Sequence, residues 1–108
     1  MATQGIVSCM SEGKVVMKLV VGCNGVQAQE TADKLKAAWP VNPEQAYKIA
    51  RDTGFGCGGC LTVITESDIF SKGDDDPPSP LFRKTFSDPE FNPRWEQGTA
   101  DHTVIINV

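Results

Sequence analysis

Two cysteines three residues apart, Cys57 and Cys60, are the side chains of this sequence most suited to chemistry. They lie within the stretch 54–65, which reads GFGCGGCLTVIT. Two thiolates at this spacing can join in one disulfide or bind one metal ion. Redox enzymes of the thioredoxin type place the first such cysteine at a helix N-terminus, where the helix dipole stabilises the thiolate. The β-branched residues after Cys60 predict a strand instead, so the sequence shows no source of an activated thiol.

A zinc site is the second chemical interpretation of the same stretch. Structural zinc binds its ligands in a tetrahedron, and Cys23 and the single histidine, His102, could complete the set. This requires the end of a hairpin, the glycine turn and the last strand to converge. The metal or redox candidates are therefore Cys57, Cys60, Cys23 and His102. We expect no cofactor, with zinc as the alternative.

The glycines of this stretch allow two further interpretations. Gly54, Gly56 and Gly59 satisfy the pattern G-x-G-x-x-G, but a dinucleotide site needs a strand before the glycines and a helix after them. Here the predicted order is reversed. The other interpretation is structural: the glycines supply positive φ angles in a connection from helix to strand, and the cysteines fill small apolar spaces. Cys23, expected on the core face of its strand, fits that filling role as well.

Length and composition indicate a single domain that spans 1–108. The chain has 108 residues, of which 40% are hydrophobic and 22% charged, and a formal net charge of −4. An acidic chain without a basic stripe repels polyanions, so we expect no nucleic acid partner. No apolar run is long enough to span a bilayer, so we expect no membrane association and a cytoplasmic location. The four cysteines are then expected to be reduced thiols, metal ligands or redox groups rather than a disulfide framework.

A β-hairpin is predicted at the start of the chain. The segments 5–10 and 14–23 flank Glu12 and Gly13, which can adopt the positive φ angles of a tight turn. The period of two in the second segment predicts which side chains face the core. These are Val15, Met17, Leu19, Val21 and Cys23.

Two helices are predicted after the hairpin. Residues 27–39 carry apolar side chains at helical spacing, and Pro40 ends that helix. The second helix begins after Asn42, which serves as N-cap with Gln45 as its capping-box partner. It ends at Gly54, a typical residue just beyond a helix C-terminus.

The remaining elements complete a small α+β domain. Strands are predicted at 61–65 and 102–108, with an acidic, proline-rich loop at 73–80 between them. The order β-β-α-α-β-loop-β predicts a mostly antiparallel sheet of about four strands with two helices packed on one face.

The segment 81–95, LFRKTFSDPEFNPRW, is rich in aromatic residues and cannot form one helix, because prolines interrupt it. Two short helices cover only one face of a sheet, so an outward set of apolar side chains would stay exposed: Val16, Val20, Ile64 and Ile105. The aromatic rings either cover this second face or contact a partner. The interface candidates are Phe82, Phe86, Phe91, Arg94 and Trp95.

These observations favour a small non-catalytic binding domain or a homo-oligomeric interaction domain. The alternative is a thiol-redox or metal-binding protein centred on Cys57 and Cys60. A hydrolytic triad of Asp101, His102 and a cysteine would depend on a spatial arrangement that a sequence does not show. We therefore expect that the protein is not an enzyme.

Overall fold

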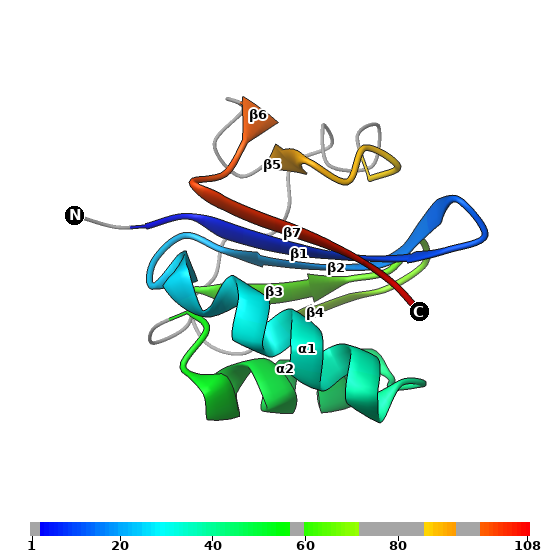
Figure 1. Ribbon diagram of the computed structural model, residues 1–108, viewed down its shortest axis with the longest axis horizontal. Coiled ribbons are helices and arrows are strands. Elements are labelled where there is room, and N and C mark those ends of the chain that lie inside the picture. Colours follow the sequence, from blue (N-terminus) through cyan, green and yellow to red (C-terminus); the bar gives the residue numbers. More distant parts are fainter. Residues whose placement is uncertain (1–2, 57–59, 72–85, 93–97) are drawn as a thin grey trace.

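The computed structural model describes residues 3–56, 60–71, 86–92 and 98–108. They form an α+β fold in which two helices lie against one side of a five-stranded sheet and a two-stranded sheet lies on the other side (Figure 1). The predicted fold class is confirmed. The strands of the large sheet, in spatial order, are β4 (Ile69–Ser71), β3 (Leu61–Ile64), β2 (Lys14–Val21), β1 (Gly5–Ser11) and β7 (His102–Asn107). The small sheet pairs β5 (Phe91–Asn92) with β6 (Gly98–Thr99).

The large sheet is mostly antiparallel, as predicted, but it has one strand more than expected. β4 is an additional strand, so the sheet has five strands rather than about four. The last strand, β7, pairs in parallel with β1, whereas the other neighbours pair antiparallel. A hydrophobic pattern identifies a segment as a strand, but it does not say which strand lies beside it. β4 and β7 are the two edges of the sheet.

The helical elements are the short 3-10 helix η1 (Gly25–Gln27), α1 (Ala28–Ala38) and α2 (Pro43–Thr53). η1 leads directly into α1. The helix α1 packs against β7 and β1, and α2 packs against β3 and β4. No helix of the described segments has the length and apolar character needed to cross a membrane.

Two elements form from the local signals that predict them. Glu12 and Gly13 have φ angles of 53° and 77°, the positive values that a two-residue type I′ turn needs at both positions. In α2, the Asn42 side chain accepts a hydrogen bond from the Gln45 backbone N–H at 2.8 Å, and the Gln45 side chain accepts one from the Asn42 N–H at 2.8 Å. Gly54 follows the helix with a φ of 82°. The predicted hairpin and capping box are confirmed.

A β-bulge in the hairpin changes which side chains face the helices. Cys9 pairs with Met17, but Met10 pairs with Val15, so Val16 is an extra residue in β2. Val15 consequently lies on the side away from the helices, and its predicted place among the core-facing residues of β2 is wrong. Val16 packs against the helix side instead.

The main core lies between the sheet and the helices, on what we call the helix face. Its buried members come from β1, β2, β3, β7, both helices and the connection after α2. They are Val7, Cys9, Met17, Leu19, Val21, Ala28, Ala32, Leu35, Ala46, Tyr47, Ala50, Phe55, Leu61, Val63 and Ile106.

The opposite side, the second face, has a smaller apolar cluster. Val15, Val20 and Ile64 are buried there together with Phe86. Val20 and Ile64 of the predicted outward set are buried, because Phe86 of the aromatic segment packs against them, which is one of the two predicted alternatives. Ile105 remains 41% exposed.

The second face also buries a charged side chain. Lys18 is 0% exposed, and its Nζ donates to the backbone carbonyls of Asp88 and Phe91. Its cross-strand neighbour Ser8 donates from Oγ to the carbonyl of Pro89 at 2.6 Å. Two polar side chains of the sheet thus hold the segment 86–92 through its main chain.

Candidate functional site

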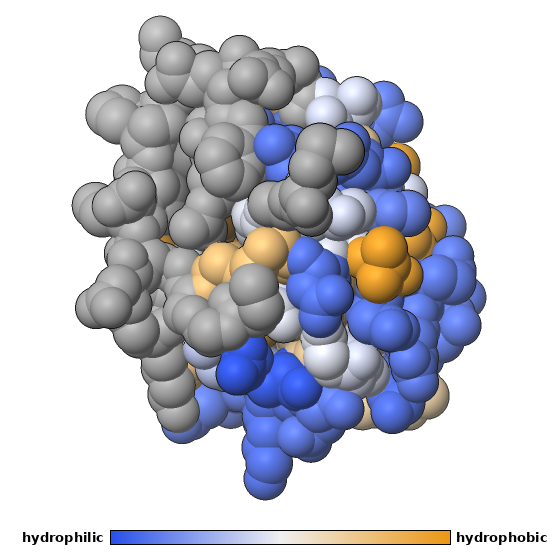
Figure 2. Space-filling view, turned by 90° about the vertical axis from the view of Figure 1, so that its left-hand side faces the viewer, coloured by the Kyte–Doolittle hydropathy of each residue, from blue (hydrophilic) through white to orange (hydrophobic). Residues whose placement is uncertain are grey.

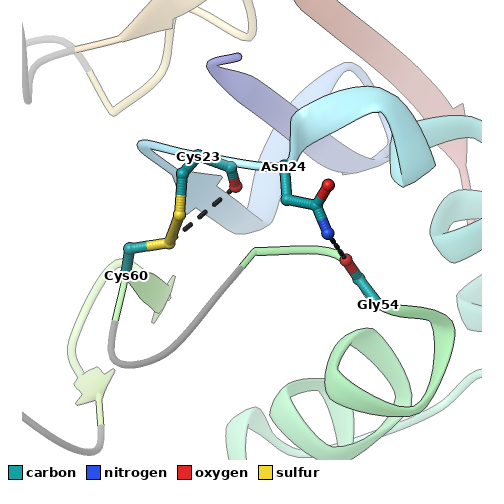
Figure 3. Close-up of a disulfide and its surroundings, with 4 residues drawn as sticks. All are labelled: Cys23, Asn24, Gly54 and Cys60. Carbon is teal, nitrogen blue, oxygen red and sulfur yellow. Dashed lines mark hydrogen bonds between the residues drawn. A yellow bond between two sulfur atoms is a disulfide. The ribbon is translucent and has the colours of Figure 1, made fainter. Parts of the chain in front are cut away.

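Cys23 and Cys60 form a disulfide at the end of the large sheet (Figure 3). Their Cα atoms are 6.7 Å apart, within the range that a disulfide spans. The pairing follows from strand register: Val21 of β2 lies opposite Leu61 of β3, so the residues just beyond this pair are neighbours. The sequence spacing indicated Cys57 as the neighbour of Cys60, whereas the disulfide of the structure joins Cys60 to Cys23.

The loop that carries Cys23 is fixed to the end of α2 by its next residue. Asn24 has a φ of 58°, a left-handed conformation that asparagine tolerates better than most residues. Its side-chain amide donates to the Gly54 carbonyl at 2.7 Å (Figure 3). The Asn24 carbonyl accepts a hydrogen bond from the Gly56 N–H at 3.3 Å. The disulfide therefore lies beside a junction of β2, η1 and α2.

The first part of the glycine-rich stretch connects helix to strand. The Phe55 N–H donates to the Ala50 carbonyl at 2.9 Å, which closes the C-terminus of α2, and the Phe55 ring is fully buried. A Cβ on Gly56 would lie 2.9 Å from Cγ1 of Val21, so no larger residue fits without a shift. These contacts agree with the structural interpretation of Gly54 and Gly56.

Both residues of the disulfide are half-buried. Cys60 Sγ lies 3.8 Å from the Cys23 carbonyl oxygen, a contact that becomes a hydrogen bond only when Cys60 is a protonated thiol. Figure 2 shows this end of the molecule, where the described surface is mostly hydrophilic with small hydrophobic areas. Val26 of η1 is 54% exposed.

The other metal or redox candidates do not gather around the disulfide. Leu61, Val21, Gly5 and His102 lie in one row across neighbouring strands. Strands in a sheet are about 4.8 Å apart, so His102 is about 14 Å from Leu61, far beyond the reach of ligands on one zinc ion. Cys57 lies outside the described residues. Among the residues that the structure describes, no group of three or more His, Cys, Asp or Glu side chains could hold a metal ion.

Cys9, the remaining described cysteine, lies in the core. It is 0% exposed on the helix face, and burial raises the pKa of its thiol to about 12. A thiol that stays protonated is a poor nucleophile. Cys9 therefore fits the role of an apolar filler.

The buried amine of Lys18 is the functional group that the sequence pattern did not indicate. Burial lowers the pKa of Lys18 to about 8, while the nearby Asp88 carboxylate acts in the opposite direction. The alternation of β2 places Lys18 on the second face, where a charged side chain would ordinarily reach solvent. Among the described residues, the segment 86–92 returns over the sheet and accepts hydrogen bonds from Lys18, and no local signal shows that return.

The predicted interface residues fall into two groups. Phe86 is 7% exposed and packs within the chain, and Phe91 in β5 is half-buried. Phe82, Arg94 and Trp95 lie outside the described residues. The part of the aromatic segment that the structure describes covers the second face, and a role in self-association stays a prediction.

Comparisons of this chain with protein-family models, with curated proteins and with solved structures find no match.

Proposed function

We propose that this protein takes part in thiol–disulfide exchange through Cys23 and Cys60. The observation that carries the proposal is the half-buried disulfide between the end of β2 and the start of β3. It joins loop residues beyond the ladder rather than residues within a buried core. The proposed exchange requires that a partner thiolate reach one of its sulfur atoms from solution.

The exchange balances with a dithiol partner, either a small molecule or a protein. A thiolate of the partner attacks one sulfur of the disulfide, forms a mixed disulfide and releases the other cysteine as a thiolate. The partner's second thiolate then attacks the mixed disulfide and releases the second cysteine. Two electrons and two protons pass to the protein, which becomes a dithiol while the partner becomes a disulfide.

One feature of the sequence supports reversible exchange. Cys57 precedes Cys60 by three residues, a spacing at which two cysteines can share a disulfide. An attack by Cys57 on Cys60 would release Cys23 within the same chain.

A redox role also reconciles the disulfide with the cytoplasmic location that the sequence suggests. Cytosolic thiols are kept reduced, and the disulfides found there are usually transient and catalytic or redox-sensing. A permanent structural disulfide would instead point to an oxidising compartment. The reduction potential of the pair distinguishes these two roles.

The experiment is a redox titration of the purified protein in buffers poised from about −150 mV to about −350 mV. Free thiols are trapped by alkylation, and mass spectrometry identifies which cysteines are modified. We expect Cys23 and Cys60 to become reduced together, with a midpoint above about −300 mV, the limit below which structural disulfides usually lie. Buried Cys9 serves as an internal control and should stay unmodified in the native protein.

Two variants separate the roles of the cysteines. Cys57→Ser keeps the described disulfide and tests whether the third thiol speeds its reduction. Cys60→Ser removes the described pair. A midpoint below about −300 mV would mean that the disulfide is structural and would refute the proposed exchange.

A further inference from the structure

The outer edge of β7 is an unpaired strand edge within the described part of the chain. β7 is the last strand in the sheet order and pairs with β1 on one side only. His102 donates its backbone N–H to Gln4 and Val108 donates to Met10, so alternate residues of β7 bond to β1. The backbone groups of the residues between them point away from β1. These residues are Thr103, Ile105 and Asn107.

This edge lacks the features that usually prevent strand addition. Protected edges are short, or they carry proline or charged side chains. β7 has six residues, HTVIIN, with neither proline nor any acidic residue, lysine or arginine. The opposite edge, β4, has only three residues. The two edges of one sheet are thus protected unequally.

The sequence of β7 is complementary to itself when two copies run antiparallel about Ile105. In that register Ile105 lies opposite Ile105 of the second copy, and Thr103 lies opposite Asn107. All these residues have outward backbone groups, so each opposite pair exchanges both of its backbone hydrogen bonds. No charged Asp, Glu, Lys or Arg side chains face each other in this register, so the pairing has no charge repulsion. In this register the same strand from each copy supplies the backbone hydrogen bonds for the other, which is a symmetric, isologous contact.

One side-chain observation agrees with this register. Ile105 is 41% exposed, and a facing Ile105 from the second copy would cover it.

We infer that a second copy of this chain pairs antiparallel with the outer edge of β7, centred on Ile105. The two large sheets then form one continuous sheet, with the helices of both copies on the same side. The contact uses none of the cysteines, so it does not depend on the proposed thiol exchange.

The first test measures the mass of the full chain in solution by sedimentation equilibrium, from about 1 µM to about 100 µM and with a reductant present. We expect a monomer–dimer equilibrium in which dilution dissociates the dimer. Ile105→Lys places two positive charges opposite each other and should abolish the dimer. Ile69→Lys is the matched control, because Ile69 lies in β4 at the other edge and is also 41% exposed. That variant should dimerise like the parent chain.

The second test cross-links the two copies at position 105, so its expected result is the formation of a dimer rather than its loss. In the inferred register the Cα atoms of the two facing residues at position 105 are about 5.5 Å apart, a distance that a disulfide spans. Ile105→Cys should form a covalent dimer under mild oxidation, and mass spectrometry should locate the bond at this position. Ile69→Cys should not form one. A parent chain that is monomeric at every concentration, or an Ile105→Lys variant that still dimerises, would overturn the inference.

Discussion

The two faces of the large sheet are covered in different ways. On the helix face, α1 and α2 place apolar side chains against apolar strands, and the buried cluster has no charged member. On the second face, the segment 86–92 crosses the sheet with the help of one buried aromatic ring, while Lys18 and Ser8 bind its carbonyl groups. The first face depends on the hydrophobic effect, which is non-directional. The second depends in part on hydrogen bonds from a few donors to one short stretch of main chain.

This difference explains why the sequence predicts the cover of the helix face but not the cover of the second face. In a helix, a repeating pattern of apolar residues predicts which side is buried. The segment 86–92 has no such pattern, because the sheet holds it by its backbone rather than by its side chains. Removing single side chains from each face should therefore have different consequences.

The largest effect is expected on the helix face. Leu35 of α1 is fully buried there, and Leu35→Ala should lower the free energy of unfolding by about 3 kcal/mol through the lost apolar contacts and the cavity left behind. The loss should be the same at pH 7 and pH 9, since no ionisable group is involved. Urea unfolding followed by circular dichroism measures it. Lys36→Ala, at an exposed neighbouring position on the same helix, is the control and should change the stability little.

An intermediate effect is expected on the second face, and it should depend on pH. The pKa of Lys18 is about 8 in the folded protein, lower than the value of 10.5 expected in an unfolded chain. Between these values the unfolded state binds a proton that the folded state has lost, so stability rises with pH. The stability should be greater at pH 9 than at pH 7 by about 1 kcal/mol. Below about pH 8 both states bind the proton and the contribution disappears.

The comparison of stability between pH values stops at pH 9, because the buried thiol of Cys9 affects the stability above that pH. Burial raises the pKa of Cys9 to about 12, so its contribution to stability falls as the pH rises through the unfolded value of 9. Lys18→Met should remove the rise between pH 7 and pH 9, whereas Lys14→Met, at an exposed position of the same strand, should keep it. An unchanged slope in Lys18→Met would mean that a different group titrates.

The smallest effect is expected from a single neutral hydrogen bond on the second face. Ser8→Ala removes the donor to the Pro89 carbonyl and should lower the free energy of unfolding by about 0.5 kcal/mol at any pH from 7 to 9. Ser87→Ala, an exposed serine of the same segment, is the control. A loss as large as that of Leu35→Ala would show that the second face is held as strongly as the helix face.

The parts of the fold that the sequence predicts are those whose signals are local. The turn at Glu12 and Gly13 needs positive φ angles, and its residues supply them within the turn itself. The capping box of α2 lies within a few consecutive residues, from Asn42 to Gln45. Each of these motifs carries its own hydrogen bonds, so no distant partner is needed to recognise it.

The parts that the sequence does not predict depend on distant partners. β4 is too short to stand out and exists through its pairing with β3. The bulge that moves Val15 to the second face reflects the pairing of β1 with β2, which the alternation of β2 alone does not contain. The disulfide follows the same rule, since Cys23 and Cys60 meet only because β2 and β3 are neighbours. Spacing along the chain drew attention to Cys57 and Cys60 instead.

The parallel pairing of β1 with β7 has a consequence for how the chain folds. The hairpin of β1 and β2 can form early, since its strands are joined by a tight turn, but β1 must wait for a strand from near the other end of the sequence. Contacts between distant segments require a long loop to close, and proteins rich in such contacts fold slowly. Until β7 arrives, β1 is a temporary edge of the growing sheet, and α1 lacks the strand against which it packs. The incomplete chain would then be most prone to aggregation during the interval before its last strand docks.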